Sequence, residues 1–177
     1  MLRVLLLVIS LLVVTAAVVA QQRHSGVGKP ATADEIRTRD ITVLSDGRGL
    51  PAGHGTAEQG RAVYEAKCAS CHGERGQGSK DFPALAGGLG TLAGPEPNPT
   101  VGSYWPYATT VWDYIHRAMP YQSPGSLTSD QVYSVTAYIL YMNKIIGEHD
   151  ELNNTTLPRV KMPNRNGFVP DPSLDVK

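Results

Sequence analysis

The only two cysteines of this 177-residue chain lie three positions apart, at Cys68 and Cys71, and His72 follows the second one directly. A disulfide between them would close a very small, strained loop and add little stability. A thioredoxin-like redox pair would need a strand–helix–strand setting, whereas a helix followed by a glycine-rich loop is expected here. Two sulfurs and one nitrogen also leave a four-ligand zinc site incomplete. All three alternatives are therefore weak.

Covalent attachment of one haem c is the interpretation that remains, because C-x-x-C-H is the attachment motif for c-type haem. One helical turn spaces Cys68 and Cys71 to reach the two vinyl groups of the porphyrin. His72 then lies over the iron as an axial ligand. Haem also accounts for residues 73–108, a Gly- and Pro-rich stretch too long for an empty loop in a compact domain.

Residues 1–20 form an apolar leader that carries a single charge, Arg3. The apolar run is long for a signal peptide and just short of a comfortable membrane span. Small residues at Val18 and Ala20 favour cleavage before Gln21, and an uncleaved leader would anchor the protein. In both cases the rest of the chain is exported, so we expect a periplasmic location.

The charges balance, with 16 basic and 16 acidic residues, which argues against a nucleic-acid partner. The 18 glycines and 13 prolines predict long irregular connections. We expect an extended arm over 21–55 with a short strand at 40–47, a haem domain over 56–147 and a proline-rich tail over 148–177. The tail has too few apolar residues to order by itself, so it is either mobile or laid against its own domain or a partner.

Three helices are predicted within the haem domain, over 56–67, 109–118 and 128–146. The first and the third open with a Thr-x-x-Gln capping box. The second carries apolar residues spaced to share one face, and a Met-Pro dipeptide ends it.

The second axial ligand must come from elsewhere in the chain, because His72 covers one face of the haem only. Met119 stands on an irregular turn in "RAMPY" and is the preferred candidate. Met142 lies on the apolar side of a helix and suits a core role, while Met162 also precedes a proline and is the less favoured alternative. His116 is expected to be solvated or near a haem propionate. The other histidines, His24, His54 and His149, are expected at the surface.

A ligand pair of His72 and Met119 would suit electron transfer, because a full coordination sphere leaves no open position for a substrate. The aromatic stretch "GSYWPYATTVWDY" precedes Met119. Tyr104 and Trp105 are predicted to line the haem pocket and donate to its propionates, while Trp112 could equally be ordinary core.

A helix ending in CASCH, a Met-Pro turn and a terminal amphipathic helix together resemble the class I cytochrome c domain over about residues 56–146. The resemblance implies an all-α fold in which few helices and long loops pack around one covalent haem. It also implies that Cys68 and Cys71 carry the haem and that His72 and Met119 are its axial ligands.

Three strings outside that generic frame are similar to the c-type cytochrome subunit of sulfur dehydrogenase in the Sox sulfur-oxidation system: "GSYWPYATTVWDYIHRAMPYQSPGSL", "VYSVTAYILYMN" and "LPRVKMPNRNGF". They also resemble the cytochrome partners of sulfite dehydrogenases. In that family the cytochrome takes electrons from a molybdenum-cofactor subunit and passes them to downstream periplasmic cytochromes. This resemblance covers about residues 40–168.

The chain departs from some members of that family, which carry a second haem domain, because it has a single C-x-x-C-H. A one-haem chain could serve a molybdenum enzyme with a different sulfur substrate. Two other functions remain open at this point. One is a free-standing electron shuttle without a fixed partner, and the other is a haem enzyme whose sixth iron position is open.

Overall fold

The computed structural model describes residues 28–170, which fall into two compact units divided between Asp40 and Ile41. The first unit contains helix α2 (Ala33–Arg39), which has no buried residue and opens with a capping box between Thr32 and Glu35. The predicted extended arm over 21–55 thus includes a helix that the sequence analysis missed. The predicted signal peptide, residues 1–20, lies outside the described residues. Within 28–170, no helix has the length and apolar character needed to cross a membrane.

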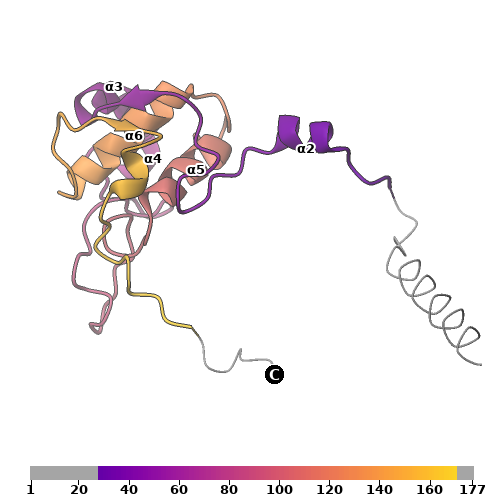
Figure 1. Cartoon of the computed structure of the whole chain (residues 1–177). Coiled ribbons are helices and arrows are strands. Elements are labelled where there is room, and N and C mark those ends of the chain that lie inside the picture. Colours follow the sequence, from indigo (N-terminus) through magenta and orange to yellow (C-terminus); the bar gives the residue numbers. More distant parts are fainter. Residues whose placement is uncertain (1–27, 171–177) are drawn as a thin grey trace, which may run out of the picture. The chain divides into compact units, whose positions relative to one another are not determined.

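The second unit is built from helices α3 (Ala57–Lys67), α4 (Ala69–His72), α5 (Ala108–Ala118) and α6 (Ser129–Met142). Figure 1 shows α3, α5 and α6 gathered above a long irregular loop. The three predicted helices and both predicted Thr-x-x-Gln capping boxes are confirmed. The segment between α4 and α5 contains no helix or strand, as the sequence predicts.

Helix α6 ends four residues before the predicted end at Ile146. Asn143 terminates it by donating from its side-chain amide to the carbonyls of Ile139 and Leu85, at 2.9 and 3.0 Å. Lys144 then adopts a left-handed backbone conformation with φ of 59°. The polar side chain of Asn143 therefore marks the end of the helix.

The crossing of α3 and α6 forms the scaffold of the domain. Gly60 of α3 faces the backbone of Ser134 in α6 so closely that a Cβ atom at position 60 would overlap the Ser134 carbonyl. One turn later Tyr64 is fully buried, and its ring lies 5.2 Å from that of Tyr138. This contact fixes the C-terminal end of α3, where Cys68 follows.

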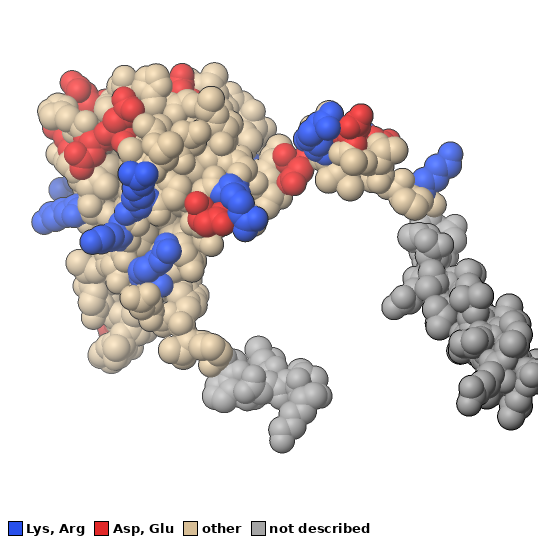
Figure 2. Space-filling view, in the orientation of Figure 1, with Lys and Arg blue, Asp and Glu red and all other residues tan. Residues whose placement is uncertain are grey.

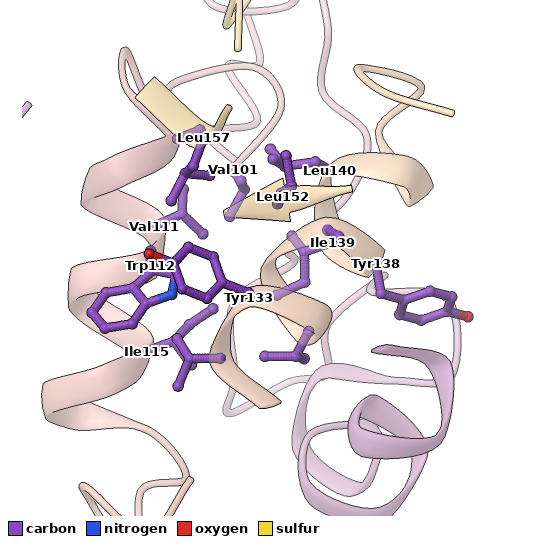
Figure 3. Packing of buried hydrophobic residues seen from close by; sticks show 14 of the residues in the cluster. Val101, Val111, Trp112, Ile115, Tyr133, Tyr138, Ile139, Leu140, Leu152 and Leu157 are labelled. Atoms are coloured by element: carbon purple, nitrogen blue, oxygen red, sulfur yellow. The ribbon is translucent and has the colours of Figure 1, made fainter. Parts of the chain in front are cut away.

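The hydrophobic core lies between α5 and α6 (Figure 3). Trp112 of α5 is fully buried against Tyr133 of α6, with ring centroids 5.3 Å apart. The Tyr133 hydroxyl donates to the Pro51 carbonyl at 2.9 Å, which ties the segment before α3 to the core. Trp112 was considered either as a haem-pocket residue or as an ordinary core residue. The structure shows that it belongs to the core.

The segment after α6 packs on its own domain. Strand β2 (Leu152–Asn153) pairs antiparallel with β1 (His54–Gly55), and the 3-10 helix η1 (Leu157–Arg159) follows. Leu152, Leu157 and Met162 are all buried. Of the alternatives for the tail, the structure therefore shows packing against the domain itself up to Met162.

The expectation of a strand at 40–47 is wrong, because that segment is irregular and ends in a turn. Its Val43 is buried, and the Val43 amide donates to the Asp113 carboxylate of α5 at 3.1 Å. A side chain thus satisfies the backbone of this segment, where a strand would need a neighbouring strand. The all-α class holds, with one two-stranded sheet added.

Candidate haem site

A cavity of about 270 Å³ opens between α4, α5, α6 and the irregular loop. Its wall includes Cys68, Cys71, His72 and Met119. The rest of the wall is mostly apolar and includes Leu85, Val101, Val111, Ile115, Leu127, Val135 and Ile139. Chemical groups from residues 68 to 119 are therefore brought together around one apolar space.

The junction of α3 and α4 holds the two thiols. Cys68 ends α3 and precedes α4, and its carbonyl accepts hydrogen bonds from the amides of Cys71 and His72 at 3.1 and 2.9 Å. Both cysteines are half-buried. Burial, with a smaller contribution from Cys71, raises the pKa of the Cys68 thiol to about 11, so the unattached thiol is protonated at neutral pH. The turn thus places both cysteines in the wall of the cavity.

The His72 ring is oriented by the loop that follows it. Its Nδ1 lies 2.9 Å from the carbonyl oxygen of Pro83, and the Phe82 ring stands edge-on to the imidazole at 6.3 Å. A carbonyl oxygen can only accept, so Nδ1 carries a proton and donates it, and in the neutral ring Nε2 is then the nitrogen with a free lone pair. A second partner of this kind is typical of metal-bound histidine. The geometry fits an axial ligand.

Among the three candidate methionines, Met119 is the one that lines the cavity. It lies directly after α5, where its amide donates to the Ile115 carbonyl at 3.0 Å. Met162 is only 3% exposed and contributes to the core and to a separate groove of the C-terminal segment. Met142 packs beside the core. These positions favour Met119 over Met162, and its coordination of iron stays a prediction.

The two aromatic residues predicted for the pocket, Tyr104 and Trp105, lie in different places in the structure. Trp105 lines the cavity, but Tyr104 is not part of its wall and is 45% exposed. The Tyr104 ring instead packs against Phe168, with ring centroids 5.1 Å apart. The sequence analysis also missed Phe82 and Pro83, which orient His72, because nothing local marks a loop residue that returns to the motif.

His116 and Arg117 do not belong to the cavity wall. His116 stacks on Trp112 with ring centroids 4.8 Å apart, and its buried Nδ1 has no hydrogen-bond partner within residues 28–170. Arg117 pairs with Asp113 on the same helix and reaches the Ile41 carbonyl at 3.4 Å. The neighbourhood of a propionate, one option for His116, receives no support from these contacts.

The family model for cytochrome c matches residues 57–143. In addition, the crystal structure of the sulfane dehydrogenase SoxCD from Paracoccus pantotrophus contains a chain that is 44% identical, with a TM-score of 0.77. That likeness covers 83% of this chain and 72% of the SoxCD chain. The chain belongs to the cytochrome c family. It therefore carries covalently bound haem c, has the class I cytochrome c fold and transfers electrons.

Curated relatives of this cytochrome include subunits of larger enzymes. The fructose dehydrogenase cytochrome subunit of Gluconobacter japonicus is 37% identical over 87 residues, which are 46% of this chain and 18% of that protein. The cbb3-type cytochrome c oxidase subunit CcoP of an Azospirillum species is 32% identical over 90 residues, which are 48% of this chain and 30% of that protein. The cytochrome thus spans less than a third of the length of either relative.

Proposed function

We propose that this cytochrome is the electron-transfer subunit of a sulfur or sulfite dehydrogenase. In this proposal it is exported to the periplasm, accepts electrons from a molybdenum-containing subunit and passes them to a downstream cytochrome c. The single observation that supports it most is the 44% identity to a SoxCD chain over 83% of the sequence. The strings YWPYATT and KMPNR point the same way, because they resemble that family outside the haem motif.

Four side chains hold the haem in this proposal. Cys68 and Cys71 would form the two thioether links, and His72, through Nε2, and Met119, through its sulfur, would hold the iron. The haem, when bound, would supply one-electron chemistry. The apolar wall excludes water, and a thioether ligand raises the reduction potential relative to a second histidine.

The subunit is not expected to be catalytic alone. Two-electron oxidation of a sulfur substrate would take place at molybdenum, and each electron would then reduce one ferric haem. Export is supported by the apolar leader and by the covalent haem, whose attachment takes place on the far side of the membrane. The identity of the sulfur substrate would be a property of the molybdenum subunit.

Rapid mixing of the oxidised cytochrome with a molybdenum-containing sulfur or sulfite dehydrogenase subunit from the same host, in the presence of sulfite or thiosulfate, tests the proposal. We expect the ferrous haem spectrum to form within the turnover time of the enzyme, and not to form when the molybdenum subunit is left out. A cytochrome that stays oxidised with both substrates, or that purifies from its host free of any molybdenum protein, would contradict the proposal. That outcome would favour the free-standing shuttle.

A further inference from the structure

Residues 158–168 run over the surface of the domain, and we call this segment the strap. Met162 anchors it in the core at 3% exposure. The Asn164 side-chain amide donates to the Tyr104 carbonyl at 2.7 Å, and the Arg165 guanidinium lies 4.1 Å above the Tyr107 ring. The strap is therefore held in one conformation before any partner arrives, which lowers the entropy cost of binding.

The strap carries a local excess of positive charge in a chain that is neutral overall. Arg159, Lys161 and Arg165 are all exposed, and residues 158–168 contain no Asp or Glu. Figure 2 shows Lys and Arg side chains gathered on the left half of the domain, below a separate group of acidic side chains near the top. A surface of this kind attracts a carboxylate-rich surface at long range.

Two exposed aromatic side chains stand at the end of the strap. Tyr104 is 45% exposed and Phe168 is 52% exposed, and their rings meet edge to face at 5.1 Å. Aromatic residues and arginine are enriched in the centres of protein–protein interfaces, where they supply most of the binding energy. The strap thus combines charge for steering with apolar area for affinity.

The strap is also tied to the wall of the haem cavity. Its two contacts, at Tyr104 and Tyr107, lie on either side of Trp105, which lines the cavity. A protein bound to the strap would therefore lie beside the segment that supplies Trp105 to the cavity wall. Phe82 and Tyr121, which belong to the cavity wall, come from other segments and would remain free for a second partner.

We propose that the strap, together with Tyr104, is the docking surface for an acidic face of the protein that donates electrons to this haem. The inference rests on the proposed function, because it assumes that the donor is the molybdenum subunit. Beyond the proposed function, the inference specifies which side of the cytochrome the donor binds and which charge the donor's surface carries. On docking, one electron passes from the donor to ferric haem and no proton or ligand is exchanged.

Two charge-reversal variants of the holo-cytochrome test the docking surface. Arg159→Glu/Lys161→Glu reverses two strap charges and leaves Arg165, which holds the strap, unchanged. Arg75→Glu/Lys80→Glu is the matched control, since it reverses one Arg and one Lys that are exposed on the irregular loop. The measurement is the second-order rate constant for haem reduction by the molybdenum subunit with sulfite, at low and at high ionic strength.

We expect the strap variant to react about tenfold more slowly than wild type at low salt and the control less than about twofold more slowly. The difference should shrink at high salt, where the charges are screened. Equal rates for wild type and strap variant, or equal losses in the strap and control variants, would overturn the docking surface alone. A wild-type cytochrome that the molybdenum subunit does not reduce would overturn the proposed function and the docking surface with it. Unchanged haem spectra and unfolding midpoints verify that both variants are folded.

Discussion

Replacing Gly60 by alanine tests the crossing of α3 and α6, on which the position of the haem motif depends. Two effects of opposite sign compete. Alanine is favoured over glycine within a helix by about 1 kcal/mol, and Gly60 has an ordinary helical conformation, so the substitution would stabilise an isolated α3. The new Cβ, however, would overlap the carbonyl oxygen of Ser134 and touch the Cβ of Tyr138 at 3.0 Å.

The steric effect should win, because the obstructing atom belongs to the backbone of α6. Residues 132–140 of that helix are buried throughout, so α6 can move only by disturbing the core. Overpacking of this kind costs about 1–3 kcal/mol and sometimes more. At the upper end of that range, and after the gain of about 1 kcal/mol in helix propensity, we expect the free energy of unfolding to fall by about 2 kcal/mol.

Guanidinium unfolding of the holo-protein, followed by circular dichroism, gives the free energy of unfolding for both proteins. Ala62→Gly, at an exposed position of the same helix, is the control for helix propensity and should cost about 1 kcal/mol. If Gly60→Ala is as stable as wild type, or more stable, the helices do not cross at Gly60 as described.

Three further predictions concern ligation, capping and pH. Met119→Ala should abolish the long-wavelength sulfur-to-iron absorption band of the oxidised protein, whereas Met162→Leu should keep it, and the reverse result would exchange the two roles. Thr128→Ala removes the capping box of α6 and should lower the free energy of unfolding by about 1 kcal/mol in guanidinium titrations, while an unchanged value would mean that the cap contributes nothing. Burial raises the pKa of Tyr133 from 10.0 to about 12. The unfolded chain therefore loses this proton first, stability falls between pH 10 and 12, and Tyr133→Phe should make that fall shallower in unfolding curves measured across the same range.

The predictions that succeeded are those fixed by nearby residues. A capping box and a helical period lie within one or two turns, so the helices that begin after Thr56 and Thr128 were found at the correct start. The C-x-x-C-H motif is local too. It predicted a covalent haem, and membership of the cytochrome c family confirms that prediction. The end of α6 depends on Asn143 reaching the Leu85 carbonyl in the irregular loop, and that end was misplaced.

The features that were missed depend on contacts between distant segments. Strands β1 and β2 are two residues each and exist only because His54 meets Asn153. Val43 does not belong to a strand, because the Asp113 carboxylate of α5 accepts the hydrogen bond that its amide would donate in a sheet. Trp105 lies in the cavity wall, whereas the ring of Tyr104 lies against Phe168 of the strap, sixty-four positions later in the chain. None of these pairings leaves a pattern in its own stretch of sequence.

The mass of the intact protein under denaturing conditions tests the central claim most directly. The claim is that one haem is bound through the sulfurs of Cys68 and Cys71. Protein produced in a host that matures c-type cytochromes should exceed the mass of its polypeptide by that of one haem, even after unfolding in acid. A mass equal to that of the polypeptide alone, with free haem released into solution, would contradict the account.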